Sequence, residues 1–283
     1  PGSDRAGSNL FETVRVADAA SEASRLRAAP LTWDTGAEGD RWIAYSAMGS
    51  MRHEAGDSYG ALAHFSTALS LASVARDPGA ERAVLGEIAL THAYRGALGA
   101  AEAALRACTA LPLPASHPAA AQAHETAASL IVALARLDAG APALIERFRA
   151  STAPSFTSVC VDLARIRWCV ATNDLECLHE RSLRGQQPRS VARSAAARDA
   201  EIYGVVLAQV AMSDLNRAWA TLDTTADGPL SQFATARLAL QAGFIDRAET
   251  IFCSPALAAR LTPALRAERT LLDFSLSAAR GRP

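Results

Sequence analysis

The sequence contains no lysine, since all 28 basic residues are arginine. This absence excludes Schiff-base chemistry, attachment of pyridoxal phosphate and a P-loop lysine within the chain. A GC-rich genome is the simplest cause of the bias. The formal net charge is −1, so the chain lacks the overall positive field that holds a nucleic-acid backbone. We therefore expect no direct binding of nucleic acid by this chain.

Aromatic residues are also scarce, at 6% of the 283 residues, although half of the chain is hydrophobic. The apolar content comes mainly from alanine and leucine, which suit closely packed helices better than a sheet core. No apolar run reaches the roughly 18 residues that a membrane-spanning helix needs. The sequence therefore predicts an all-α protein that has no membrane partner.

The five cysteines are an odd number, and no Cys-X-X-Cys motif is present. In a helical chain of this size we expect buried free thiols and a cytoplasmic location. Cys169 and Cys177 form an exception to weigh, because they flank the polar turn 171–174 at similar distances. A disulfide across a helical hairpin is the alternative there, provided that the two Cα atoms lie within about 7 Å of each other.

Sequence motifs of catalysis and metal binding are missing as well. His-Glu pairs begin at His53, His124 and His179, but none has the second histidine four residues on that a helical zinc site needs. No Gly-X-Ser-X-Gly, Walker or dinucleotide-binding glycine motif occurs. The arginine-rich stretch 181–198 lacks interleaved aromatic residues, so we interpret it as a solvated loop leading into a helix. We expect no enzyme, no metal and no cofactor.

What the chain does contain is a repeated pattern, in which a turn residue precedes an alanine by five positions and a large residue by nine. The clearest copy is Gly56, Ala61 and Phe65. Other copies are Gly96-Ala101-Leu105, Ser213-Ala218-Leu222 and Gly243-Ala248-Phe252, with weaker ones around Gly140 and from Asn173. The turns fall at about 56, 96, 139, 173, 213 and 243, roughly one helix-turn-helix unit apart.

Each part of this pattern has a physical role. The turn residue ends one helix, and the alanine lets the second helix approach the first closely. The large residue fills the gap between neighbouring hairpins. Because no hairpin can bury its apolar face alone, the hairpins must stack. We therefore divide the chain into a remnant of an expression tag (1–3), an N-terminal helix and loop (4–39), helical repeats (40–257) and a C-terminal capping helix and tail (258–283).

The first unit resembles a tetratricopeptide repeat. The residues that carry the likeness are Tyr45, Met48, Gly49, Gly56, Ala61, Phe65 and Ala68. The third and fourth units depart from the pattern, since Leu144 and Leu178 stand where alanine is expected. The resemblance implies a right-handed superhelix of about six helix-turn-helix repeats with N- and C-terminal capping helices. In composition the chain is most similar to repeat regions of bacterial LuxR-type or maltose-regulator-type transcription regulators.

The resemblance also implies a concave groove lined by the first helix of each pair. Its inward positions in this chain include Ser46 and Ser50, and the candidate binding residues are His53, Glu54, Tyr94, Arg136, Arg167, Tyr203 and Arg237. Arginine presents a planar fork of donors that matches carboxylates and phosphates. We therefore expect the groove to take a peptide or a small ligand with an acidic group. The alternative for each arginine is an ordinary solvated position.

These observations leave three functions to compare. The favoured one is a non-enzymatic scaffold that binds a protein or peptide partner in the concave groove. The first alternative is the sensing domain of a larger bacterial transcription regulator, which responds to a small-molecule effector or a partner. The second, less favoured, is an enzyme whose site lies within the helical shell and follows no known motif. The sequence leaves the oligomeric state open.

Overall fold

The computed structural model describes residues 41–112, 119–149, 155–184, 194–222, 228–261 and 263–280. Within these ranges the chain is helical and has no strand, which confirms the predicted all-α class. The N-terminal helix and loop expected over residues 4–39 lie outside the described part of the chain.

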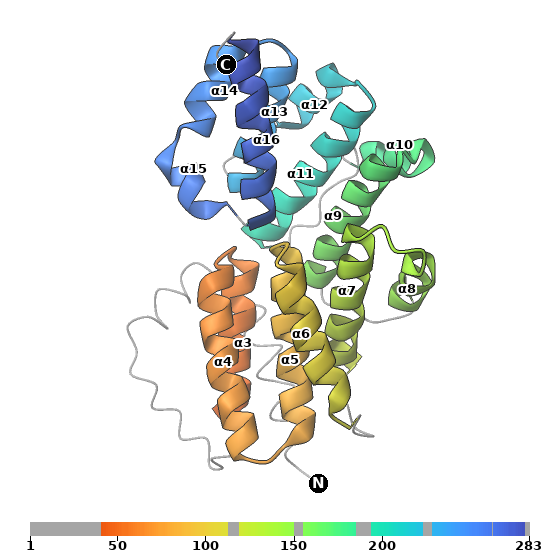
Figure 1. Ribbon diagram of the computed structural model, residues 1–283, viewed down its shortest axis with the longest axis vertical. Helices are drawn as coiled ribbons and strands as arrows, with labels where there is room; N and C mark the ends of the chain where they lie inside the picture. The colour runs from red at the N-terminus through yellow and green to blue at the C-terminus, as the bar shows by residue number, and fades with distance from the viewer. Residues whose placement is uncertain are drawn as a thin grey trace.

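The helices follow one another in pairs that pack side by side (Figure 1). The first helices of the pairs are α3 (Arg41–Glu54), α5 (Pro78–Tyr94), α7 (Ala119–Ala135), α9 (Ser155–Thr172), α11 (Ala195–Ala211) and α13 (Pro229–Gln241). The second helices are α4 (Ser58–Val74), α6 (Leu98–Ala110), α8 (Ala141–Arg149), α10 (Leu175–Arg184), α12 (Leu215–Leu222) and α14 (Ile245–Phe252). The chain closes with α15 (Pro255–Arg260) and α16 (Pro263–Ala279).

One turn geometry joins the two helices of every pair and also joins α4 to α5. In the first turn the Gly56 amide donates to the His53 carbonyl at 2.9 Å, and the Asp57 amide donates to the Arg52 carbonyl at 2.8 Å. These two bonds close a helix end around one left-handed residue, and the other turns repeat both. The left-handed residues are Gly56, Arg76, Gly96, Leu137, Asn173, Ser213 and Gly243.

An aspartate follows the left-handed residue in five of these turns and caps the next helix. Its side chain accepts from a backbone amide two or three residues on, as Asp57 does from Gly60 at 2.9 Å. The other four are Asp77, Asp138, Asp174 and Asp214. An aspartate directly after the left-handed residue is therefore the sequence feature that most turns between the described helices share.

The turns confirm the predicted hairpins, with one shift of register. The third turn was expected near residue 139, but its left-handed residue is Leu137. The residue fully buried at the start of the second helix is therefore Ala141, whereas Leu144 is only partly buried. In the fourth hairpin Leu178 does take the place of the alanine, and it is 1% exposed.

Small residues allow the helices of a pair to come close. The alanines singled out by the repeat, at 61, 101, 218 and 248, are all fully buried. In the first hairpin the ring of Phe65 lies over Gly49, so that a Cβ added there would sit 2.4 Å from a ring carbon. Phe65 was expected to fill the space between hairpins. It belongs to a cluster that includes Val84 of the next hairpin, and it also covers a glycine of its own hairpin.

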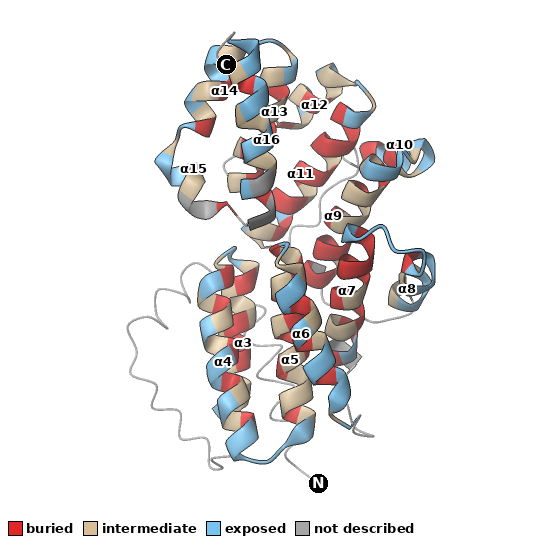
Figure 2. Ribbon diagram, viewed as in Figure 1, coloured by how far each residue is buried: buried red, intermediate tan, exposed pale blue. Residues whose placement is uncertain are grey.

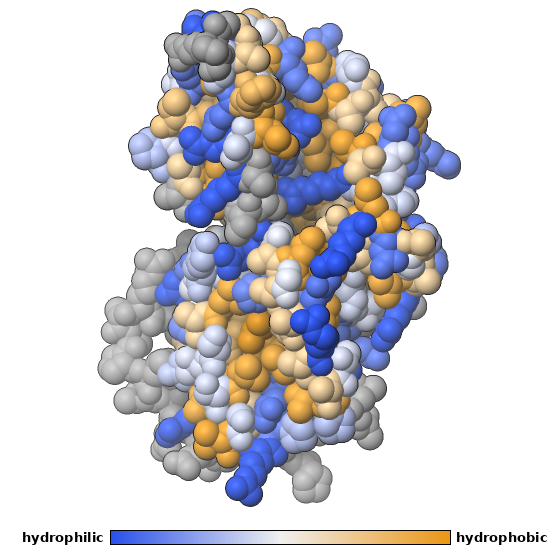
Figure 3. Space-filling view, viewed as in Figure 1, coloured by the Kyte–Doolittle hydropathy of each residue, from blue (hydrophilic) through white to orange (hydrophobic). Residues whose placement is uncertain are grey.

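The first helices form a continuous layer, because each packs against the first helix of the next pair. This layer curves, since α3 also contacts α11, and a Cβ at Gly56 would lie 3.9 Å from that of Ala196. Figure 2 shows the buried residues following the sides on which the helices face one another. On the visible face, hydrophilic side chains gather at the junction between the α3–α6 and α11–α16 parts (Figure 3). Polar groups therefore collect where the curved layer closes.

Asp199 of α11 links two hairpins by capping a helix that is not its own. Its buried carboxylate accepts from the amides of Leu230 and Ser231, at 2.9 Å each, and from the Ser231 hydroxyl at 2.5 Å. These amides belong to the first turn of α13, which has no capping side chain next to it in sequence. The start of α13 is thus fixed by a residue about thirty positions earlier in the chain.

The left-handed turn at Leu137 makes stability sensitive to one Cβ atom. The Leu137 side chain is 54% exposed, so Leu137→Gly removes backbone strain and little packing. We expect a gain of about 1 kcal/mol in the free energy of unfolding, read from the urea midpoint at constant slope. The matched control is Gly243→Ala, where an added Cβ meets nothing within 4 Å and only the backbone penalty acts. A loss of stability in the first variant contradicts the strain argument.

The cap supplied by Asp199 predicts a large effect of a single substitution. Asp199→Ala leaves two buried amides of α13 without an acceptor, and we expect it to cost roughly 2–4 kcal/mol. Asp77→Ala removes a cap at an exposed position and serves as the control, at about 1 kcal/mol. Chemical denaturation of both variants gives the loss in the free energy of unfolding. Equal losses would mean that the link between α11 and α13 adds no stability beyond an ordinary helix cap.

Candidate functional site

Six of the seven candidate groove residues lie on the first helices of the pairs, which form the continuous layer. They are His53, Glu54, Tyr94, Arg167, Tyr203 and Arg237. The seventh, Arg136, lies apart at the end of α7, where its exposed guanidinium pairs with Glu102 at 2.7 Å. The structure therefore brings together most of the predicted set and leaves Arg136 outside it.

The first group within this set is aromatic. The ring of His53 lies edge-on to Tyr94, with centroids 5.5 Å apart, and to Phe156, with centroids 5.0 Å apart. His53 is only 4% exposed, and its Nδ1 lies 3.3 Å from the Thr91 hydroxyl. Burial, helped by the charges of His124 and Arg95, lowers the pKa of His53 to about 3. His53 is therefore a neutral packing residue near neutral pH.

Glu54, the neighbour of His53, is partly buried and acts electrostatically on the same interior. Burial raises the pKa of the Cys160 thiol, and the negative charge of Glu54 raises it further. The Cys160 thiol is thus held protonated and is a poor nucleophile. This part of the interior offers packing surface and no activated group.

The second group is charged, and we call it the Glu268 cluster: Arg167, Tyr203, Arg237 and Glu268. Glu268 lies on α16 and forms an ion pair with Arg237. The Tyr203 hydroxyl donates to the two Glu268 oxygens at 3.2 and 3.4 Å. The Arg167 guanidinium lies 5.7 Å from the centre of the Tyr203 ring. Arg237 of α13 therefore pairs with a carboxylate that the C-terminal helix supplies, and Arg167 of α9 lies beside the tyrosine that donates to the same carboxylate.

The electrostatics of the Glu268 cluster favour an anion at this place. Burial opposes the charge of Arg167, yet Tyr203 and Glu268 together raise the pKa of its guanidinium above the ordinary value. Burial also raises the pKa of the Tyr203 hydroxyl, so this group stays protonated and can donate. Two guanidinium groups and one donor hydroxyl form a site that is complementary to a single carboxylate.

A third group surrounds Glu87 of α5, which is 7% exposed. The hydroxyl of Ser46 donates to Glu87 at 2.5 Å and that of Ser50 at 2.9 Å, while Nδ1 of His124 lies 4.0 Å away. Burial raises the pKa of Glu87 to about 7, although both serine hydroxyls act to lower it. The serines donate to the carboxylate and not to an imidazole, so the group lacks the order of a hydrolytic triad.

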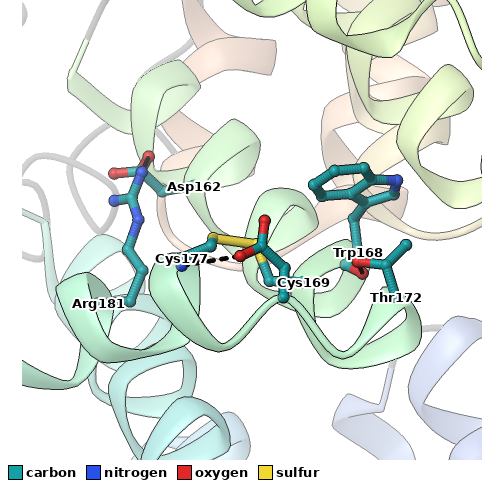
Figure 4. Close-up of a disulfide and its surroundings, with 7 residues drawn as sticks. Asp162, Trp168, Cys169, Thr172, Cys177 and Arg181 are labelled. Atoms are coloured by element: carbon teal, nitrogen blue, oxygen red, sulfur yellow. Dashed lines mark hydrogen bonds and ion pairs between the residues drawn. A yellow bond between two sulfur atoms is a disulfide. The ribbon is translucent and has the colours of Figure 1, made fainter.

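The cysteines divide into a bridged pair and free thiols. Cys169 and Cys177 form a disulfide with Cα atoms 6.2 Å apart, between the end of α9 and the start of α10 (Figure 4). The expectation of free thiols is therefore wrong for this pair, and the hairpin alternative is what the structure has. Cys108 and Cys160 are free and buried, and Cys253 is free and exposed.

Sequence reasoning missed the two carboxylates on which the polar groups depend. The sequence singles out neither Glu87 nor Glu268. Neither has a local signal, because each meets its partners through contacts that span 31 to 65 positions. A charged residue on the apolar side of a helix is the one hint that Glu87 offers.

Comparisons with known proteins do not place the chain in a family. No protein-family model, no curated protein and no solved structure matches it. Within the described part of the chain, no helix has the length and apolarity to cross a membrane. The likeness to tetratricopeptide repeats therefore rests on residues of this sequence.

The raised pKa of Glu87 makes stability depend on pH. The pKa of this carboxyl is about 7 in the folded chain, whereas the ordinary pKa of a free glutamate carboxyl is 4.5. Its contribution is therefore full below pH 4.5 and is lost as the pH rises through about 7. Glu87→Gln keeps a hydrogen-bonding amide but cannot titrate. We expect the stability of the wild type relative to this variant to fall by roughly 1–3 kcal/mol across that window.

The comparison with the variant also removes the opposing effect of His53. The pKa of His53 is about 3 in the folded chain against 6.5 for a free imidazole, so its contribution is present above pH 6.5 and is lost as the pH falls. This effect is common to both proteins and cancels. Denaturant midpoints measured at several pH values give the difference, and a difference independent of pH contradicts the assignment.

Proposed function

We propose that the chain is a non-enzymatic scaffold whose concave face binds an acidic helical segment of a partner protein. In this proposal the six hairpins form a right-handed superhelix like that of tetratricopeptide repeats, with first helices lining the groove. The observation that carries the proposal is the Glu268 cluster, in which Arg237 and Tyr203 contact one carboxylate from another helix and Arg167 lies beside the Tyr203 ring.

The C-terminal helix α16 serves as an example of what the groove accepts. It packs against α14, and in Figure 1 it runs in front of α13 and beside α11. Its inward side carries Glu268 together with Leu265 and Leu276, which are 2% and 8% exposed. An amphipathic helix laid into a groove is a common mode of recognition, in which apolar anchors supply affinity and a charge supplies specificity.

The energy of this contact allows exchange with a partner. The Arg237 and Glu268 side chains are each about one quarter exposed, at 24% and 26%. An ion pair with this access to water contributes about 1 kcal/mol, well below the gain from burying the leucines. A partner helix with an acidic residue at the same register and stronger apolar anchors can therefore replace α16. Since stacked hairpins hold the arginines in place, little ordering of the receptor opposes binding.

The proposal is tested with a chain that ends at Leu261 and a fluorescent peptide of residues 263–280. We expect the peptide to bind in a fluorescence anisotropy titration, and Glu268→Gln in the peptide to weaken binding about tenfold, since a charge-assisted bond is lost. Arg167→Ala with Arg237→Ala in the receptor should do the same, with helical circular dichroism unchanged.

Arg136→Ala is the matched control, because Arg136 lies outside the Glu268 cluster and pairs with Glu102. It should leave the affinity for the peptide unchanged. Equal affinity for the wild-type peptide and the Glu268→Gln peptide would refute recognition of an acidic group. Equal effects of the Arg136 and Arg167/Arg237 variants would refute the location of the site.

A further inference from the structure

The tip of the α9–α10 hairpin gathers three groups that ligate metals. One ligand atom each from Cys169, Asp174 and Cys177 lies within 4.8 Å of the other two. In the described part of the chain, this is the one group of three such residues found at that spacing. The two sulfur atoms form the disulfide of Figure 4, so the three groups are available to an ion only when that bond is reduced.

Local geometry places the three residues together. The left-handed Asn173 reverses the chain, and Asp174 then caps α10 by accepting from the Cys177 amide at 3.1 Å. Capping brings the Asp174 carboxylate next to the side chain three residues on. Cys169 faces both from the last turn of α9. These contacts come from the turn and not from the disulfide, so we expect them to persist after reduction.

The surroundings favour negative charge on the two sulfur atoms. Cys177 lies in the first turn of α10, where the positive end of the helix dipole favours a thiolate. Arg181 lies one turn further along α10 and is 3% exposed; Figure 4 shows it beside Cys177. One of its guanidinium nitrogens pairs with Asp162 at 2.8 Å, and its buried Nε has no hydrogen-bond partner. A buried cation thus offsets part of the charge that two thiolates and a carboxylate would bring.

The two sulfur atoms of the disulfide differ in their exposure to solvent. Cys169 is fully buried in the core, which fixes the position of its sulfur, while Cys177 is partly exposed. A small thiol reaches Cys177 first, forms a mixed disulfide there and releases the Cys169 thiolate, which takes up a proton. A second small thiol then frees Cys177. The net change oxidises two small thiols to one disulfide and converts the protein disulfide to two cysteine thiols.

We propose that the reduced hairpin binds one thiophilic divalent ion of the zinc class. The ligands are the thiolates of Cys169 and Cys177 and a carboxylate oxygen of Asp174, with a fourth position for water or an external donor. Binding releases the two thiol protons. Tetrahedral zinc takes sulfur at about 2.3 Å and oxygen at about 2.0–2.2 Å, so after reduction the two sulfur atoms must move apart from their bonded separation to make room for the ion. Rotation of three side chains brings them to the ion.

The same residues then alternate between two chemical states. A disulfide oxidant of low molecular weight takes two electrons from the thiolates, forms the Cys169–Cys177 bond and is itself reduced to two thiolates, which take up two protons from the solvent. The ion loses two of its three protein ligands and is released. The hairpin stays cross-linked in either state, by sulfur or by metal, so oxidation changes the bound ion without opening the fold.

Cobalt(II) is the probe that tests the site, because thiolate ligation gives it a visible charge-transfer band. The full chain carries Cys253→Ser, which removes the exposed thiol, and is reduced with a phosphine under anaerobic conditions. We expect one equivalent of cobalt to bind with tetrahedral absorption, zinc to displace it, and oxidation by a small disulfide to release it. Cys177→Ser should abolish the band, and circular dichroism should show unchanged helix content throughout.

The carboxylate ligand has a matched control in the next hairpin. Asp214 caps α12 as Asp174 caps α10, by accepting from the amide three residues on at 3.2 Å. Asp174→Asn should weaken cobalt binding about 10- to 100-fold, whereas Asp214→Asn should leave it unchanged. A reduced chain that stays folded without a charge-transfer band overturns the proposal, as does a reduced hairpin that loses its helix content. Equal affinities of the two variants overturn the role of Asp174.

Discussion

Two backbone hydrogen bonds close a helix around one left-handed residue at each of seven turns, and the rest of the structure depends on this constraint. It reverses the chain within about three residues, so the second helix of a pair must return along the first. Seven turns repeat it, and in five of them an aspartate starts the next helix. Because these contacts are local, the sequence around each turn sets the direction of its hairpin.

Close packing then turns the hairpins into a layer. Fully buried alanines let paired helices approach, and the first helices pack successively against one another. A layer of this kind leaves a polar interior where its ends meet, and the chain satisfies the groups there in different ways. His53 is held neutral, Glu87 is held by two serine hydroxyls, and Arg237 meets a carboxylate from α16. The last of these arrangements is the one that a partner helix replaces in the function we propose.

The parts of the fold that follow from local chemistry were predictable. Gly56, Ala61 and their copies predict the turns and the buried faces, and the structure confirms them. The third turn was predicted near residue 139, because Gly140 is the nearest residue that favours a turn. The left-handed residue is Leu137, and leucine gives no sequence signal for that conformation. The bridge between Cys169 and Cys177 could be offered only as an alternative, since the register of one turn decides the distance.

Only the residues that the first helices contribute to the candidate site could be predicted from the sequence. Inward positions of a repeat identify Arg167, Tyr203 and Arg237, but nothing local identifies Glu268, because α16 reaches them from the end of the chain. The same holds for Asp199, whose partners in α13 lie about thirty residues away. Contacts between residues that lie far apart in sequence can be identified only from the structure.

Hydrogen exchange of α16 tests most directly the central claim that the arginines of the Glu268 cluster add to the apolar packing that holds this helix. In the full chain carrying Arg167→Ala and Arg237→Ala, the account predicts faster exchange of the α16 amides, with α3 to α8 unchanged. Unchanged protection of α16 in that variant would contradict it, because the helix would then be held by apolar packing alone.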